Sequence, residues 1–152
     1  IAITVAKRVK DSVVTAVDIS DRALKTAAEN VERNGVNIRL VKADALTDMS
    51  AVGEFDIIVS NPPYIPTGDL DGLQREVKEF EPRLALDGGA DGLDFYRIIA
   101  EEVGKYLTRG GTLIMEVGEG QAKAVAKLFK RCDYSMIVKD FAGIDRFVKI
   151  VF

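Results

Sequence analysis

The stretch FDIIVSNPPYIP, residues 55–66, places a carboxamide and an aromatic ring directly after a run of apolar residues. The apolar run predicts a buried strand, and the two prolines end it because proline lacks an N–H donor and has a fixed φ. The side-chain oxygen of Asn61 and the carbonyl of Pro62 can then both accept hydrogen bonds from one NH₂ group, in a geometry that the prolines hold fixed. Tyr64 supplies an aromatic face for a planar group. We therefore predict a binding site for an amide or aryl NH₂ group.

The chemistry predicted for this site is nucleophilic attack by nitrogen. The lone pair of such an NH₂ group is delocalised, and acceptors on both N–H bonds push electron density toward the nitrogen. No histidine is needed, because the proton can leave after the nitrogen has become cationic. The alternative is that NPPY is only a strand stop built from turn residues.

The sequence excludes several other chemistries. It contains no histidine, which removes Ser–His and Cys–His pairs and imidazole metal ligation. Cys132 is the only cysteine, so an internal disulfide and a structural zinc site are excluded as well, and we expect a half-buried thiol and no metal.

Three more polar residues stand at or near the carboxyl ends of apolar segments, namely Asp18, Asp44 and Glu116. In a parallel sheet, ligands bind outside the carboxyl ends of the strands at the topological switch point. Together with Asn61, these residues predict one crevice. The Asp18 carboxylate could accept hydrogen bonds from ribose hydroxyls, or it could be a helix-entry residue. Asp44 could accept from an adenine amino group, or it could form a turn.

The elements that must position these residues alternate along the chain. Strands are predicted at 13–20, 37–44, 55–60 and 112–118, and helices at 1–10, 21–35, 91–107 and 121–132. Ser20 can cap the second helix and Gly35 can end it. Residues 65–91 predict a long irregular connection, of a kind that is usually functional. The strands at 134–141 and 146–152 predict an antiparallel pair, so the whole is an α/β fold with a mostly parallel sheet covered on both faces.

The composition and charge of the chain limit the possible functions further. The chain of 152 residues is 47% apolar and 30% charged, an ordinary balance for one soluble globular domain. Its net charge of −3 and its pI of about 5.1 argue against a nucleic-acid-binding surface, which is usually basic. No apolar run reaches the ~18–20 residues of a membrane span, and no signal peptide is visible. We expect a reducing compartment, either the cytoplasm or an organellar matrix.

NPPY after an apolar strand resembles the motif of S-adenosylmethionine-dependent methyltransferases that modify exocyclic or amide nitrogens. The wider pattern is similar to the PrmC/HemK family, since IVSNPPYIP, FEPRLALDGGADGLDFYRII, GGTLIMEVGEGQ and DFAGIDRFV follow one another in this order. The resemblance implies a three-layer, Rossmann-like class I methyltransferase sheet of order 3-2-1-4-5-7-6 with strand 7 antiparallel. It also implies S-adenosyl-L-methionine as cofactor and methyl transfer to the side-chain nitrogen (N5) of the glutamine in the Gly-Gly-Gln loop of class 1 peptide chain release factors. The release factor would be the partner, with no nucleic acid or membrane, and the enzyme would be a monomer.

The resemblance also implies which residues bind the cofactor. Asp18 would be the acid that binds the ribose, with Ile19 beside it. Asp44 and Ala45 would line the adenine pocket, and Asn61 would border the cofactor as well as the substrate.

A second set of residues is implied for the substrate. Asn61 and the Pro62 carbonyl would hold the glutamine amide, with Tyr64 and Pro63 as its walls, so Asn61, Pro62 and Tyr64 form the predicted catalytic group. Glu81 falls in a segment that the family carries near the site, and it would either belong to the substrate site or cap a loop.

The chain begins at Ile1, without methionine and inside a predicted helix. In the family, a first strand, a glycine-rich DxGxGxG loop and an N-terminal helical region that grips the release factor would come before this point. We therefore expect residues 1–152 to be the C-terminal methyltransferase catalytic domain, truncated at its N-terminus. The missing strand would be central, and its loss would leave two unpaired ladders and impaired cofactor binding in this piece.

Three other functions remain open at this point. An N6-adenine methyltransferase acting on DNA or RNA would place a flipped base in the same site and predicts a basic patch. If the chain were a catalytically inactive α/β binding module, we would expect poor cofactor binding. A nicotinamide-dependent oxidoreductase shares the acid at the strand end but gives no reason for NPPY.

Overall fold

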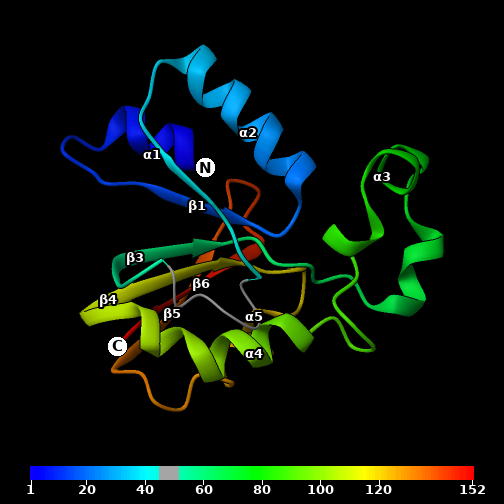
Figure 1. The fold of residues 1–152 in the computed structure, drawn as a ribbon. Helices are drawn as coiled ribbons and strands as arrows, with labels where there is room; N and C mark the ends of the chain where they lie inside the picture. Colours follow the sequence, from blue (N-terminus) through cyan, green and yellow to red (C-terminus); the bar gives the residue numbers. More distant parts are fainter. Residues whose placement is uncertain (45–51) are drawn as a thin grey trace. The chain divides into compact units, whose positions relative to one another are not determined.

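The computed structural model describes residues 1–44 and 52–152. Contacts group the chain into two compact units, Ile1–Gly53 and Glu54–Phe152. Each unit contains its own sheet, of two strands in the first and four in the second (Figure 1). Ala45, predicted to line an adenine pocket, lies outside the described residues.

The first unit contains α1 (Ala2–Arg8), β1 (Thr15–Asp18), α2 (Asp21–Asn34) and β2 (Arg39–Lys42). The two strands are parallel and in register from Thr15 opposite Arg39 to Asp18 opposite Lys42. The predicted ends of α2 are confirmed, since the Ser20 hydroxyl accepts a hydrogen bond from the Ala23 N–H and Gly35 adopts the left-handed conformation at φ 59°. Helix α2 packs against both strands. The helix therefore supports one face of this two-stranded sheet.

The second unit has a four-stranded sheet in the order β3-β4-β6-β5. β3 (Phe55–Ser60) runs parallel to β4 (Leu107–Glu116), whereas β6 (Asp145–Val151) is antiparallel to both β4 and β5 (Tyr134–Lys139). The predicted antiparallel pair at the end of the chain is therefore confirmed. Within its own sheet, each unit agrees with the corresponding part of the predicted order 3-2-1-4-5-7-6: the first unit holds strands 3 and 2, and the second holds 4, 5, 7 and 6.

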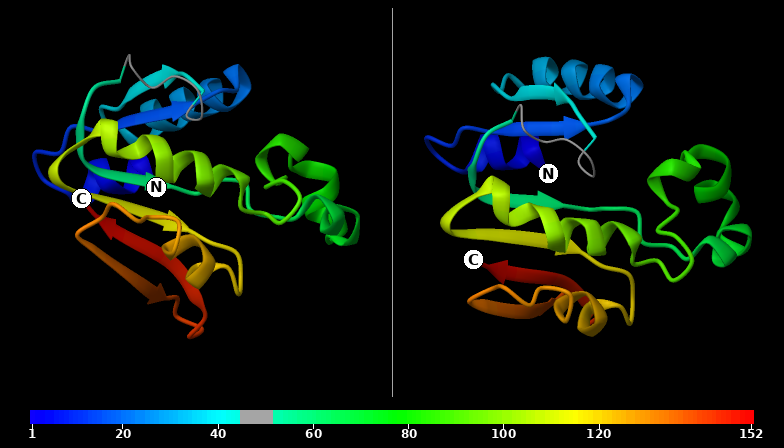
Figure 2. Two further views of the ribbon diagram at one scale, coloured as in Figure 1. Left: turned by 90° about the horizontal axis from the view of Figure 1, so that it is seen from below. Right: turned by 60° about the horizontal axis from the view of Figure 1, so that its bottom comes forward.

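One face of the four-stranded sheet carries the core. Helices α4 (Asp94–Glu102) and α5 (Ala122–Ala126) lie on the same side of it (Figure 2). Strand residues of alternating position meet helix residues there in one buried cluster, formed by Tyr96, Val103, Leu107, Leu113, Met115, Val117, Ala122, Val125, Phe129, Val148 and Ile150. Alternation along β4 directs Leu113, Met115 and Val117 to this face. The strand that leads toward the NPPY segment is thus supported by a packed neighbour, β4.

The opposite face of this sheet is less covered. Ile57 is 60% exposed and Val59 44% exposed, and Tyr134 and Met136 on β5 are also exposed. These residues alternate with those of the core face, as the pleat of the strands requires. The helices of the second unit therefore bury only one side of its sheet.

The structure differs from the predicted elements in the 65–91 segment and at the bounds of β4, α4 and α5. The segment predicted as irregular contains the short helices η1 (Thr67–Gly72), α3 (Arg75–Phe80) and η2 (Arg83–Ala85). Strand β4 begins at Leu107, not at 112, and runs through Gly110, whose φ of 78° accommodates an irregularity in the pairing with β3. The preceding helix α4 is correspondingly shorter and ends in the turn η3 (Val103–Tyr106). Helix α5 is also shorter than the predicted 121–132, since its regular part ends at Ala126.

Candidate functional site

The predicted NH₂ site follows β3 without a gap. Ser60 is the last residue of the strand and lies opposite Met115 of β4. Asn61 comes next and is exposed, whereas Pro62 is buried. Within residues 1–44 and 52–152, neither the Asn61 side chain nor the Pro62 carbonyl takes part in a hydrogen bond. Both predicted acceptors are therefore open to a ligand.

A cavity of about 100 Å³ lies at this strand end, lined by Asn61, Pro62, Tyr64, Ile65, Glu81, Ala85 and Leu86. The structure thus brings together the three residues predicted as catalytic with Glu81, which is distant from them in sequence. Pro63, predicted as a wall, is half-buried and is not among the lining residues. The Glu81 carboxylate makes no hydrogen bond or ion pair with the described residues, and its backbone N–H caps the end of α3 (Arg75–Phe80) by donating to the Val77 carbonyl at 3.0 Å. Both predicted roles of Glu81, in the substrate site and as a cap, stay predictions.

Backbone hydrogen bonds hold Leu86 near the NPPY segment. Ile65 pairs with Asp87 in an isolated parallel bridge, in which the Ile65 N–H donates to the Leu86 carbonyl at 3.0 Å and the Gly88 N–H donates to the Ile65 carbonyl at 2.8 Å. The Thr67 N–H extends this pairing by donating to Gly89 at 2.9 Å. We call these three hydrogen bonds the 65–89 bridge. It closes the segment that carries η1, α3 and η2 into a loop that starts and ends at the cavity.

Asp87 reinforces the 65–89 bridge with its side chain. Its Oδ1 accepts from the Thr67 hydroxyl at 2.7 Å and from the Gly89 N–H at 3.1 Å, and Arg83 lies 3.4 Å from its Oδ2. The hydrogen bond from Thr67, followed by those from Gly89 and Arg83, holds the pKa of Asp87 below its ordinary value. The ionised carboxylate is therefore the form that stabilises this part of the site.

Gln121 fixes the other side of Tyr64. Its Nε2 donates to the Tyr64 carbonyl at 2.9 Å, and its Oε1 accepts from the Gly118 N–H at 3.0 Å. A Cβ on Gly92 would lie 2.6 Å from the same amide nitrogen, so only glycine leaves room for this contact. Sequence analysis did not single out Gln121, although it ends the quoted segment GGTLIMEVGEGQ.

The end of β4 is anchored by Tyr96. This side chain is fully buried, and its hydroxyl donates to the Glu116 carbonyl at 2.8 Å. Burial raises the pKa of Tyr96, with smaller contributions from Tyr64 and Glu116, so the hydroxyl stays a donor. Glu116 itself is half-buried at the carboxyl end of β4, beside the end of β3.

The first unit places the residues predicted for the cofactor at the carboxyl edge of its own sheet. Asp18 ends β1 and is exposed, and Asp44 follows β2 by two residues. One Asp18 oxygen accepts from the Ser20 N–H at 2.8 Å, which supports its part in helix entry, while the other makes no hydrogen bond with the described residues. Ile19 is 48% exposed beside it. The predicted convergence of both pairs of strand ends in one crevice stays a prediction.

Two kinds of feature are absent from the described ranges. Residues 1–44 and 52–152 contain no group of three or more Cys, Asp or Glu residues arranged to hold a metal ion. In the same part of the chain, no helix is both long and apolar enough to cross a membrane.

Comparison with known proteins adds a family and several relatives. The family model described as methyltransferase small domain matches residues 1–90. The release factor glutamine methyltransferase of Geobacter sulfurreducens is 47% identical over 151 residues, covering 97% of this chain and 52% of the relative. The chain thus spans about half the length of this relative.

Solved structures agree with this result. A release-factor-specific protein-(glutamine-N5) methyltransferase from Alicyclobacillus acidocaldarius is 29% identical with a TM-score of 0.53, over 99% of this chain and 86% of that one. A methyltransferase from Pyrococcus furiosus has a TM-score of 0.70 at 21% identity, covering 97% of this chain and 66% of its own, and it supports the fold alone. The predicted class I methyltransferase fold is confirmed.

Proposed function

Because this chain belongs to the methyltransferase small domain family, we propose that its parent protein methylates the side-chain amide nitrogen (N5) of a glutamine. The substrate is the Gly-Gly-Gln loop of class 1 peptide chain release factors, and the methyl donor is S-adenosyl-L-methionine. The observation that carries this proposal is the pair of open acceptors, Asn61 Oδ1 and the Pro62 carbonyl, beside a cavity of about 100 Å³. Relatives bearing the name release factor glutamine methyltransferase support glutamine over adenine as the target.

In this proposal the residues of the second unit hold the glutamine amide. One N–H bond points to Asn61 Oδ1 and the other to the Pro62 carbonyl, and the ring of Tyr64 keeps the amide plane flat. Both acceptors polarise the N–H bonds, so electron density on the nitrogen rises. The nitrogen becomes cationic when it gains the methyl group, and one of its protons then passes to solvent water, so rate comes mainly from positioning and from the two acceptors.

The residues of the first unit fit the nucleoside part of the cofactor. The free oxygen of the Asp18 carboxylate stands at the carboxyl edge of two parallel strands, where it can accept from a ribose hydroxyl. Ile19 and Asp44 would line the adjoining base. When bound, S-adenosyl-L-methionine supplies an electrophilic methyl group on a sulfonium.

The proposed partner is a release factor, bound by a monomeric enzyme without nucleic acid. Release factors act in translation termination, so the proposed place of action is the cytoplasm or an organellar matrix. Residues 1–152 are proposed to be the catalytic domain of the parent protein.

The test uses the parent protein, including the residues that precede Ile1, with radiolabelled S-adenosyl-L-methionine. Three substrates are offered: a class 1 release factor, the same factor with its loop changed to Gly-Gly-Ala, and duplex DNA. Label on the unchanged factor alone is the expected result. Label on DNA would instead indicate an adenine methyltransferase, and no label on any substrate would indicate a silent module.

A further inference from the structure

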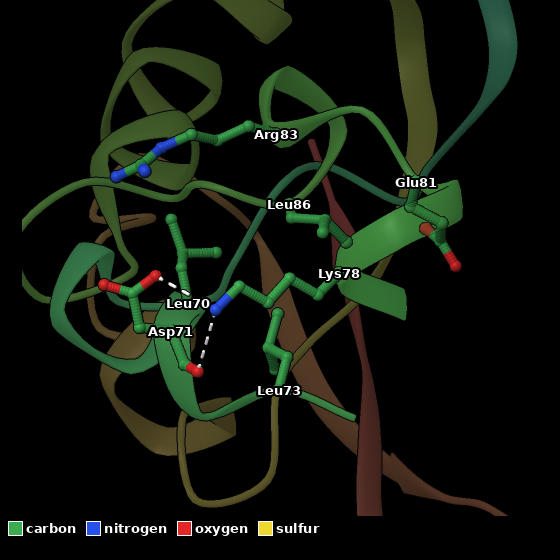
Figure 3. Close-up of a pocket in the computed structure, with 7 residues that line it drawn as sticks. All are labelled: Leu70, Asp71, Leu73, Lys78, Glu81, Arg83 and Leu86. Atoms are coloured by element: carbon green, nitrogen blue, oxygen red, sulfur yellow. Dashed lines mark hydrogen bonds and ion pairs between the residues drawn. The ribbon is translucent and has the colours of Figure 1, made fainter. Parts of the chain in front are cut away.

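We propose that a second cavity, beside the Asn61 site, binds the first apolar side chain that follows the target glutamine within two residues. This cavity has a volume of about 210 Å³ and is lined by Leu70, Asp71, Leu73, Lys78, Glu81, Arg83 and Leu86 (Figure 3). We call it the leucine cavity. The proposal rests on the proposed function and adds the recognition of residues next to the glutamine.

The leucine cavity adjoins the Asn61 site. Glu81 and Leu86 line both cavities, and the 65–89 bridge fixes Leu86 to Ile65. A polypeptide whose glutamine lies at Asn61 would therefore pass the leucine cavity with residues that are near the glutamine in sequence. An extended chain advances only about 3.3–3.6 Å per residue, so the residues nearest to the glutamine are the candidates for this cavity.

The walls of the leucine cavity favour an apolar occupant. Leu70 is only 6% exposed, and Leu73 and Leu86 are half-buried. The side chain of Lys78 passes between these leucines toward Asp71 (Figure 3). Three leucines and a methylene chain form a surface that gains free energy by covering an aliphatic side chain.

The two cations of the leucine cavity are already paired. Lys78 Nζ lies 3.4 Å from Asp71 Oδ1 and donates to the Asp71 carbonyl at 3.3 Å. Arg83 Nε lies 3.4 Å from Asp87 Oδ2, which belongs to the 65–89 bridge. An anion such as a phosphate would have to compete with these carboxylates. The leucine cavity is therefore a poor site for a nucleic acid backbone.

The size of the leucine cavity and the sequence of the proposed substrate limit which side chain can occupy it. Small molecules and cofactors usually occupy pockets of about 300–1,000 Å³, so 210 Å³ suits a single side chain better. The two residues before the target glutamine are glycines in the proposed substrate and have no side chain to offer. The occupant must then come from the carboxyl-terminal side of the glutamine.

The experiment compares two release factors that carry either leucine or glycine at both positions after the glutamine. With the wild-type parent enzyme, we expect kcat/KM to be at least about tenfold higher for the leucine factor, mainly through KM, as is typical of an apolar pocket. Leu73→Ser should reduce this preference to below about threefold. Leu84→Ser is the matched control because Leu84 is 66% exposed and lies outside both cavities.

The outcomes separate this inference from the proposed function. Equal kcat/KM on the two variant factors, whether high or low, would overturn the role of the leucine cavity while methylation of the natural factor still supports the enzyme. A Leu73→Ser enzyme that keeps the full preference would overturn it as well. If Leu73→Ser does not fold, the comparison of the two factors with the wild-type enzyme still decides. No methylation of the natural factor would instead contradict the proposed function.

Discussion

Gln121 connects the end of β4 to Tyr64, which precedes Gln121 by 57 residues, through a hydrogen bond of 2.9 Å from its Nε2 to the Tyr64 carbonyl. The same side chain accepts from the Gly118 N–H at 3.0 Å. One amide group thus uses its donor and its acceptor to hold the NPPY segment against the neighbouring strand. No charged side chain of similar size can do both, because a carboxylate offers only acceptors.

Gln121→Glu should separate these two contacts. Glutamate keeps the acceptor for Gly118 but loses the donor to Tyr64, so we expect the free energy of unfolding to fall by about 1–2 kcal/mol. Methyl transfer should also slow, because the Tyr64 backbone is released. Thermal unfolding and kcat measure the two effects. Gln74→Glu, at an exposed position whose side chain caps no helix, is the matched control, and equal behaviour of the two variants would contradict the prediction.

Asn61→Ala should remove most turnover and leave the fold intact. Loss of a pre-organised polar group at a reacting centre typically costs about 10²–10³ in kcat. Stability should hardly change, since Asn61 is exposed and its side chain makes no hydrogen bond with the described residues. Near-normal methyl transfer by a well-folded Asn61→Ala enzyme would show that Asn61 does not hold the substrate amide.

Asp18→Asn should weaken cofactor binding more than it affects the helix beside it. An asparagine oxygen can still accept from the Ser20 N–H, now 2.8 Å from Asp18 Oδ1, whereas the second carboxylate oxygen is lost. We expect the Kd for S-adenosyl-L-methionine to rise about tenfold or more, by calorimetry on the parent protein. Asp21→Asn removes a nearby carboxylate that pairs with Lys42 instead, and it should leave this Kd unchanged. Unaltered affinity in Asp18→Asn would exclude the ribose assignment.

Gly88→Ala should displace Tyr64. A Cβ at Gly88 would stand 2.8 Å from the Tyr64 Cα, closer than packed atoms allow. Overpacking of this kind costs about 1–3 kcal/mol, and the shift of the backbone should lower kcat. The control is Gly68→Ala, where an added Cβ meets nothing within 4 Å. Equal melting temperatures for the two variants would argue against close packing at Gly88.

Acid should loosen the 65–89 bridge. The Thr67 hydrogen bond, with those from Gly89 and Arg83, holds the pKa of Asp87 below its ordinary value of 3.8. A depressed carboxyl pKa stabilises the folded state fully above the ordinary value, and this contribution is lost as the pH falls through the depressed value. We expect the hydrogen-exchange protection of the Gly88 and Gly89 amides to decline, relative to β4, as the pH falls below about 4.

The matched variants for the acid experiment are Asp87→Asn and Asp69→Asn. Asp87→Asn should show low protection of these amides at every pH, because the ionised form is absent. Asp69→Asn changes an exposed carboxylate of η1 and should behave like the wild-type protein. A constant protection ratio in the wild-type protein between neutral and acidic pH would contradict the role given to Asp87.

Local sequence signals predicted those parts of the fold that local physics decides. The end of β3 before NPPY was predicted to the residue, because prolines cannot continue a strand. The ends of α2 at Ser20 and Gly35 were predicted for the same kind of reason. The start of β4 was predicted too late, at residue 112, because Gly110 precedes that point and glycine usually interrupts a strand, whereas here it supplies the left-handed residue of a strand irregularity. A glycine can thus end a helix or bend a strand, and the local sequence does not distinguish the two.

Long-range contacts account for the features that were missed. The sequence suggested Glu81 only through a resemblance, and its place beside Asn61 follows from the hydrogen bonds between residues 65–67 and 86–89. Gln121 was missed because its partner Tyr64 lies in a different part of the sequence. The short helices η1, α3 and η2 were not predicted, because glycine and proline separate them along the sequence. None of these features produces a periodic pattern of apolar residues in the sequence.

The 65–89 bridge has a consequence for how this part of the chain can vary in sequence. It ties together both ends of an excursion, residues 66–86, that supplies Glu81 and the walls of the leucine cavity. The entropic cost of closing a loop grows only slowly with loop length. An excursion with fixed ends can therefore lengthen, shorten or change sequence with little effect on the positions of Asn61 and Pro62. If Asn61 and Pro62 hold the target nitrogen as proposed, sequence changes in this excursion can alter which macromolecule is recognised while the two acceptors stay in place.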